Sequence, residues 1–152
     1  MRPFQVMNYR QINYFNLCTR RSKTGFPMPN QTVLSVVYQV GKFEEPHQDF
    51  YGLTYGISVK SKEDAIYIPK VGAALALRRF DKRPIRFTGQ VREVFTDNLQ
   101  ETIARLNTRV VYSVYDNLIQ GKLVDLFGSN SETKEDVLNL CSRFYLEGIR
   151  CM

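Results

Sequence analysis

The chain has 152 residues with a formal net charge of +6, and its 43% hydrophobic and 12% aromatic content exclude a disordered polymer and fit one globular domain spanning residues 1–152. No apolar run approaches the roughly 20 residues that cross a bilayer, and the N-terminus lacks the apolar core of a secretory signal, so we expect no membrane partner and a cytoplasmic location. Three cysteines and a single histidine, far apart in the chain, argue against a disulfide framework and predict no metal site.

The N-terminal half has the composition of β-strands. Residues 33–40 and 52–59 are rich in β-branched and aromatic side chains, which favour strands, and the polar segment 41–50 between them predicts a long hairpin connection. Residues 4–18 alternate in part between aromatic and polar, as an outer strand would. The alternation over 84–95, interrupted by a glycine, predicts a further strand with a bulge.

Helical periodicity follows. A proline presets the backbone of a first helical turn, so Pro69 favours a helix start, and apolar residues recur at helical spacing over 70–80. Asp97 or Asn98 can cap the next helix, whose apolar stripe continues over 99–127.

A last helix is predicted over 134–146, capped by Thr133. Strands therefore come first and helices last. This order predicts an α+β fold in which an antiparallel sheet from the N-terminal half packs against C-terminal helices, all on one face.

Positive charge is concentrated early in the chain. Residues 1–92 carry 15 Lys/Arg and 6 Asp/Glu, a net +9, whereas residues 93–152 carry 6 and 9, a net −3. The asymmetry indicates either a face that binds anions or a basic surface that meets an acidic one on another subunit. We expect a homo-oligomer, and both interpretations of the charge stay open.

The densest positive segment is 60–92, with 9 basic and 3 acidic residues. Arginine forks bind phosphate oxygens in pairs, but cations at a helix C-terminus are also stabilised by the helix dipole, and we weight the two explanations equally. The predicted ligand-binding residues are Tyr67, Lys70, Gly72, Arg78, Arg79, Lys82, Arg83 and Arg86.

Two of these residues have specific expected roles. Tyr67 would stack on a base. Gly72 would let a phosphate approach backbone N–H groups at the helix N-terminus, although close helix packing explains a glycine there equally well. No glycine-rich phosphate motif accompanies it.

Catalytic groups are not evident. Ser, His and Asp form no nucleophile arrangement, and His47 lies in a polar, acidic segment where a histidine is usually solvated. Cys141 is expected in the core and Cys151 at an exposed end. We predict no catalytic residue, no metal site and no cofactor.

Fragments of the chain resemble the opening motifs of the GIY-YIG nucleases. Gly56-Ile57-Ser58, then Tyr67-Ile68-Pro69 and the arginines after them, follow that pattern, except that serine replaces its first tyrosine and proline its last glycine. The resemblance implies a metal-dependent nuclease, with Glu93 or Glu101 as metal ligand. These departures make an atypical nuclease the second alternative.

A second resemblance is to small accessory proteins of tailed bacteriophages. It is carried by Lys70-x-Gly72-x-x-x-Ala76-x-x-Arg79, preceded by Ser61-x-x-Asp64. The resemblance implies a viral accessory or counter-defence factor that acts in the host cytoplasm.

The leading functional hypothesis is a non-enzymatic binding protein for a nucleotide or nucleic acid, held by the basic cluster. The alternative is a protein-interaction module that inhibits or redirects an acidic host protein. The charge distribution is compatible with both.

Overall fold

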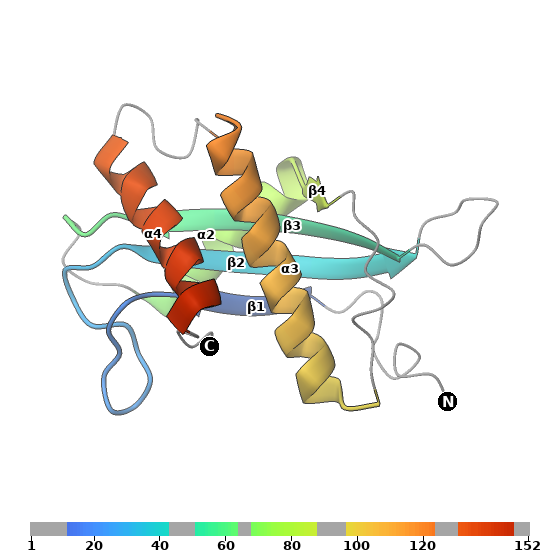
Figure 1. Ribbon diagram of the computed structural model, residues 1–152, viewed down its shortest axis with the longest axis horizontal. Coiled ribbons are helices and arrows are strands. Elements are labelled where there is room, and N and C mark those ends of the chain that lie inside the picture. Colours follow the sequence, from blue (N-terminus) through green and yellow to red (C-terminus); the bar gives the residue numbers. More distant parts are fainter. Residues whose placement is uncertain (1–11, 43–50, 64–67, 88–96, 124–130, 148–152) are drawn as a thin grey trace.

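The computed structural model describes residues 12–42, 51–63, 68–87, 97–123 and 131–147 (Figure 1). The elements in chain order are β1 (Ile12–Leu17), β2 (Val33–Lys42), β3 (Tyr51–Lys60), α2 (Pro69–Lys82), β4 (Ile85–Phe87), α3 (Leu99–Ile119) and α4 (Ser131–Glu147). The predicted α+β class is confirmed. Among the described helices, none combines the length and apolar character that a membrane crossing requires.

The four strands form one antiparallel sheet in the order β1-β2-β3-β4. β2 and β3 pair along their whole length, from Val33 opposite Lys60 to Lys42 opposite Tyr51, so the predicted hairpin pairing is confirmed. The short edge strand β4 pairs only with the middle of β3. The hairpin connection 43–50, the start of the predicted outer strand and the predicted bulge in 88–95 lie outside the described residues.

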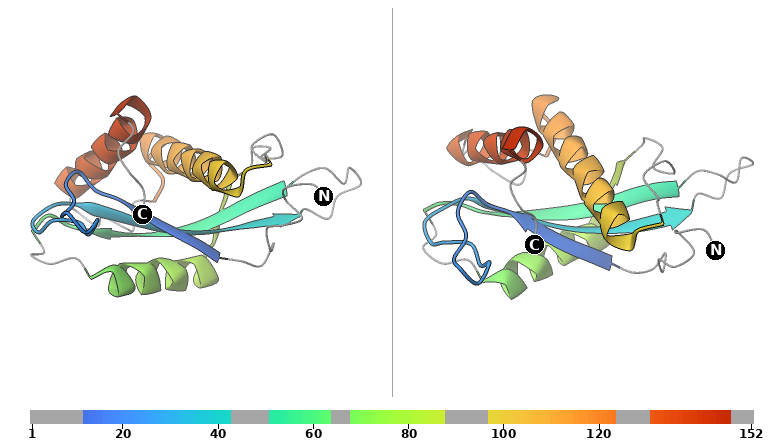
Figure 2. Two further views of the ribbon diagram at one scale, coloured as in Figure 1. Left: turned by 90° about the horizontal axis from the view of Figure 1, so that it is seen from below. Right: turned by 60° about the horizontal axis from the view of Figure 1, so that its bottom comes forward.

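Helices cover both faces of this sheet. Figure 2 shows α2 beneath it and α3 with α4 above it, so the expectation of helices on one face was wrong. The cause lies in β2, where Leu34 and Val36 pack towards α3 and α4 while Val37 packs towards α2. A strand that is apolar on both faces must be buried on both.

The larger core lies between the sheet and the C-terminal helices. Its biggest fully buried side chains include Phe15, Tyr38 and Tyr55. The tyrosine hydroxyls end at α3: the Tyr38 hydroxyl donates to Asn107 Oδ1 at 2.7 Å, and the Tyr55 hydroxyl lies 2.8 Å from Ser113 Oγ. These bonds satisfy groups that would be costly to bury unpaired and fix how α3 crosses the sheet.

The smaller core seats α2 directly on β3. Gly56 leaves so little room that a Cβ atom there would lie 2.5 Å from both Ala76 O and Phe80 N. Two residues along, Ser58 Oγ donates to Gly72 O at 2.8 Å in a buried hydrogen bond. Small residues on both partners thus bring helix and strand into backbone contact.

The ends of the C-terminal helices differ in part from expectation. Asn98 caps α3 as predicted, its side chain accepting from Glu101 N. The stripe predicted to reach residue 127 stops at Ile119, because Gly121 takes a positive φ of 77°, a conformation that ends helices. α4 begins at Ser131, so Thr133 lies buried within it rather than at its cap.

Candidate functional site

A cavity of about 650 Å³ opens beside the C-terminal end of α2. It lies where α2, β3 and the start of β4 meet the chain that follows α3. Its lining residues are Gly56, Ile57, Arg79, Lys82, Arg83, Pro84, Ile85 and Leu123. We call it the basic cavity, because its three charged residues are all cations.

Local folding explains why those three cations gather. Arg79 and Lys82 belong to the last turn of α2, and Arg83 follows as its C-cap, donating its backbone N–H to Arg79 O at 2.8 Å. Arg79 also donates from Nη1 to Ile57 O at 3.1 Å, which holds its guanidinium at the edge of β3. Among the described residues, the other N–H groups of the Arg79 guanidinium donate no hydrogen bond.

The other predicted site residues are dispersed. Arg78 is exposed on α2 outside the cavity, and Lys70 is exposed in the first turn, at the opposite end of the helix. Arg86 lines a separate hollow between β4 and α3, together with Tyr112 and Asp116. Of the seven predicted residues that the structure describes, three thus line one cavity.

Gly72 serves the packing of α2. It is buried, its N–H donates to Ile68 O, and its carbonyl accepts from Ser58. This arrangement matches the packing explanation for the glycine. Tyr67, the expected stacking residue, lies outside the described residues.

The charge asymmetry of the sequence becomes a difference between the segment of α2 and β4 and the two C-terminal helices. Residues 69–87, which form α2 and β4, hold six basic residues and one acidic residue. Helices α3 and α4 together hold four basic and six acidic residues. Among the described residues, no carboxylate lies within ion-pair distance of Lys82 or Arg83.

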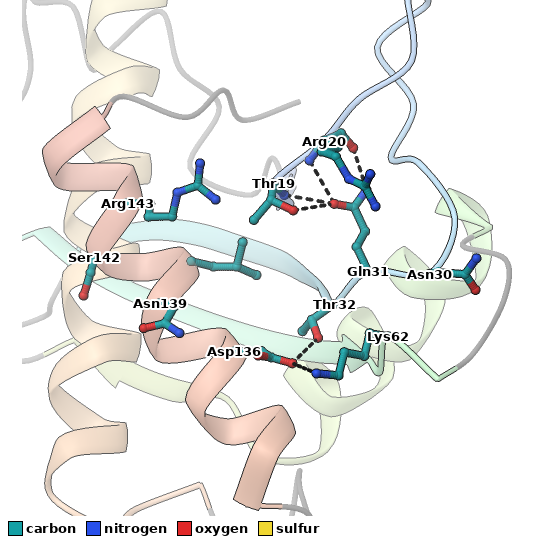
Figure 3. A pocket seen from close by; sticks show the side chains of 11 residues that line it. Thr19, Arg20, Asn30, Gln31, Thr32, Lys62, Asp136, Asn139, Ser142 and Arg143 are labelled. Carbon is teal, nitrogen blue, oxygen red and sulfur yellow. Dashed lines mark hydrogen bonds and ion pairs between the residues drawn. The ribbon is translucent and has the colours of Figure 1, made fainter.

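A second cavity, of about 430 Å³, lies between α4 and the loop that joins β1 to β2 (Figure 3). We call it the polar cavity. Its lining residues are Thr19, Arg20, Asn30, Gln31, Thr32, Lys62, Asp136, Asn139, Leu140, Ser142 and Arg143. Sequence reasoning missed it, since these residues come from three segments up to about 120 positions apart and no local motif connects them.

Gln31 fixes the loop side of the polar cavity. Its Oε1 accepts from Thr19 N, Thr19 Oγ1 and Arg20 N at 2.9–3.1 Å, and its Nε2 donates to Arg20 O and Met28 O at 2.5 and 2.8 Å. The side chain is only 6% exposed. One buried amide therefore positions the backbone from which Thr19 and Arg20 project.

The opposite wall carries an ion-pair group. Asp136 Oδ2 accepts from Thr32 Oγ1 at 3.0 Å and lies 3.9 Å from Lys62 Nζ, which also contacts Glu132 Oε1. The hydrogen bond to Glu132 is the main cause that raises the pKa of Lys62 above its ordinary value. Lys62 therefore stays charged beside both carboxylates.

In the described part of the chain, no three His, Cys, Asp or Glu residues gather as metal ligands would. Cys18 and Cys141 are buried, and burial raises the pKa of both thiols, that of Cys141 to about 12. Glu101 bonds to Arg105 at 2.7 Å. His47, Glu93 and Cys151 are outside the described residues.

Comparisons with protein-family models, curated proteins and solved structures yield no match for this chain. The functional argument therefore rests on the two cavities and on the charges around them.

Proposed function

We propose that the chain is a binding protein for a phosphate-bearing ligand, a nucleotide or the backbone of a nucleic acid, held in the basic cavity by Arg79, Lys82 and Arg83. The observation that carries the proposal is the convergence of these three cations on one cavity. Arginine forks and lysine ammonium groups are the side chains that neutralise phosphate most effectively.

The rest of the lining suits a nucleotide. Ile57, Pro84, Ile85 and Leu123 give the cavity an apolar part of its lining, and ligand sites typically combine apolar walls with a few placed polar groups. A base against that wall would leave its phosphates next to the end of α2. The cavity volume of about 650 Å³ lies within the usual range for small-ligand sites.

The bound ligand is tested first on the protein as purified. The ratio of its absorbance at the nucleotide and protein maxima would reveal a bound nucleotide. Mass spectrometry of the molecules that denaturation releases would then identify it. Nucleic acid of mixed length that salt removes would indicate backbone contacts instead.

Variants then test the cavity itself. The double variant Lys82→Gln/Arg83→Gln should weaken binding of ATP by about tenfold or more, because both cations line the cavity. Lys70→Gln, an equal change at the other end of α2, should leave binding unchanged. A substitution of Arg79 is a less suitable test, since the hydrogen bond from Arg79 to Ile57 O gives this residue a structural role too. Equal ATP affinity in the double variant and wild type would refute the proposal.

A second candidate function, docking of an acidic protein partner, is favoured by a different observation. Ile68, Val71 and Leu75 are 54%, 52% and 39% exposed, and their spacing puts them on one stripe of α2 that continues into Arg78 and Lys82. An exposed apolar stripe ending in cations suits a partner with apolar and acidic groups. Capture of one stoichiometric partner by wild type, lost in Val71→Ser/Leu75→Ser with ATP binding intact, would support docking.

The likeness to phage accessory proteins supports a viral role, and we keep that role as a proposal. Its motif residues have structural explanations here: Gly72 and Ala76 are buried against β3, and Arg79 donates a hydrogen bond to the backbone of that strand.

We also keep the homo-oligomer as a proposal. Sedimentation equilibrium on the purified protein measures the number of chains in the assembly.

A further inference from the structure

Helix α2 forms the outer layer on its side of the sheet. Figure 2 shows α3 and α4 on the opposite side, and among the described elements none lies over the outer surface of α2. The buried residues of the helix, Gly72, Ala76 and Phe80, recur at every fourth position and therefore lie on one side of it, towards the sheet. The surface on the other side of α2 is open to a partner.

This outer surface has the spacing of a coiled-coil seam. Its exposed residues are Ile68 at the N-cap, then Val71, Leu75, Arg78 and Lys82. They follow one another at intervals of three, four, three and four residues. That alternation keeps side chains in one line along a helix and is the pattern by which one helix packs against another. We call this line of five residues the α2 seam.

The α2 seam changes in chemistry along its length. Its first three residues are apolar and its last two are cations. Among the described residues, no ion pair joins Arg78 or Lys82 to a carboxylate. The one carboxylate within residues 68–83 belongs to Asp81, whose position is not one of the seam positions. A partner that complements the seam is therefore apolar at one end and acidic at the other.

The helix dipole decides which end of a partner helix is acidic. Carboxylates are stabilised in the first turn of a helix. If the partner helix runs antiparallel to α2, its first turns lie opposite Arg78 and Lys82, and its later turns lie opposite the apolar residues. The α2 helix of a second copy does not supply this partner, because its seam contains no carboxylate.

We infer that the α2 seam binds an antiparallel amphipathic helix of a partner protein, with carboxylates in its first turns and apolar side chains in its later turns. The inference rests on the docking function proposed above and specifies the structure of the partner. From Val71 to Lys82 the seam is about 17 Å long at 1.5 Å per residue, so about three helical turns of the partner cover it. The basic cavity and its ligand are not involved.

The test uses three alanine-rich peptides of three heptads each, with affinities for the full chain from amide chemical-shift titrations. The acidic-first peptide has glutamate at the seam positions of its first half and leucine at those of its second half. The reversed peptide exchanges the two halves, and the neutral peptide has glutamine in place of glutamate. The acidic-first peptide should bind about tenfold more tightly than either control, since an exposed ion pair contributes about two- to fivefold. Equal affinities, or no binding at about 1 mM, would overturn the inference.

Variants locate the bound peptide. Val71→Ser/Leu75→Ser should weaken the acidic-first peptide at least about tenfold. The matched control is Leu99→Ser/Ile119→Ser, which removes exposed apolar side chains from α3 and should leave the affinity unchanged. Arg78→Gln should weaken the acidic-first peptide about threefold but not the neutral peptide, and it should leave ATP binding intact because Arg78 does not line the basic cavity. Equal weakening of both peptides by Arg78→Gln would contradict pairing with a carboxylate and overturn the inference.

Two further outcomes separate this inference from the docking function itself. Capture of a protein partner that Val71→Ser/Leu75→Ser abolishes, together with no binding of any peptide, would retain docking and overturn the helical partner. Binding to vesicles of phosphatidylcholine and phosphatidylserine, again lost in Val71→Ser/Leu75→Ser and without peptide binding, would assign the seam to a lipid surface and overturn both.

Discussion

The contact between Gly56 and α2 makes a prediction in which sterics and strand propensity have opposite signs. Alanine and then valine are better strand formers than glycine, so propensity alone predicts that Gly56→Ala and Gly56→Val progressively stabilise the protein. The structure predicts the reverse, because a Cβ at this position would lie 2.5 Å from Ala76 O and Phe80 N and 2.8 Å from Phe80 Cα. All three are backbone atoms of α2, and no side-chain rotation can relieve the clash.

Displacing a packed helix for one inserted methyl group costs about 1–3 kcal/mol. Gly56→Ala should therefore lower the free energy of unfolding by about 2 kcal/mol, equivalent to a fall of about 4–8 °C in Tm for a chain of this length. Gly56→Val should cost more. Urea denaturation followed by far-ultraviolet circular dichroism gives both values, and Thr54→Val, on the same strand, measures propensity without the clash. Stability that rises from glycine to alanine to valine would refute the proposed seating of α2 on β3.

Three further predictions concern buried polar and titratable groups. Gln31→Leu removes five hydrogen bonds and should cost about 2–3 kcal/mol in urea denaturation; a smaller loss than about 1 kcal/mol would mean that the loop is held by other contacts. Burial raises the pKa of Tyr55 from 10.0 to about 12, so the protonated phenol stabilises the fold below pH 10 and that stabilisation is lost as the pH rises towards 12. Thermal melts at pH 9 and pH 11 should consequently differ less in Tyr55→Phe than in wild type, and an equal difference would count against the shift. In a Cys151→Ser variant, Cys18 and Cys141 should not react with a disulfide reagent until denaturant is added, because both thiols are buried with raised pKa values.

The sequence predicted features that depend on neighbouring residues. The pairing of β2 with β3, the start of α2 at Pro69 and the Asn98 cap follow from local composition and turn chemistry. Gly121 ends α3 through its positive φ, one residue after the C-cap Gln120. A sequence does not give the φ of a glycine, so it does not show which glycine ends a helix.

What sequence could not provide was the second face of the sheet and the polar cavity. Six of the eight residues over 33–40 are apolar, and that pattern fits a strand buried on both faces as well as an ordinary hydrophobic strand. Arg20 and Arg143 line one cavity only because α4 packs beside the β1–β2 loop. Residues that come together from distant parts of the chain form no motif of fixed spacing in the sequence.

The basic cluster was predictable because it is local, but its energetics depend on which end of α2 it occupies. Arg79, Lys82 and Arg83 lie where the helix dipole is negative, so the dipole stabilises the cations in the absence of ligand and opposes an incoming phosphate. A phosphate there is attracted only by the charged side chains, unlike a phosphate at a helix N-terminus, which also gains from backbone N–H groups. Binding in the basic cavity should accordingly weaken steeply with added salt, and Asp81→Asn, which removes the one carboxylate of residues 69–87, should strengthen it. An affinity that is independent of salt would show that apolar contacts with Ile57, Ile85 and Leu123 hold the ligand instead.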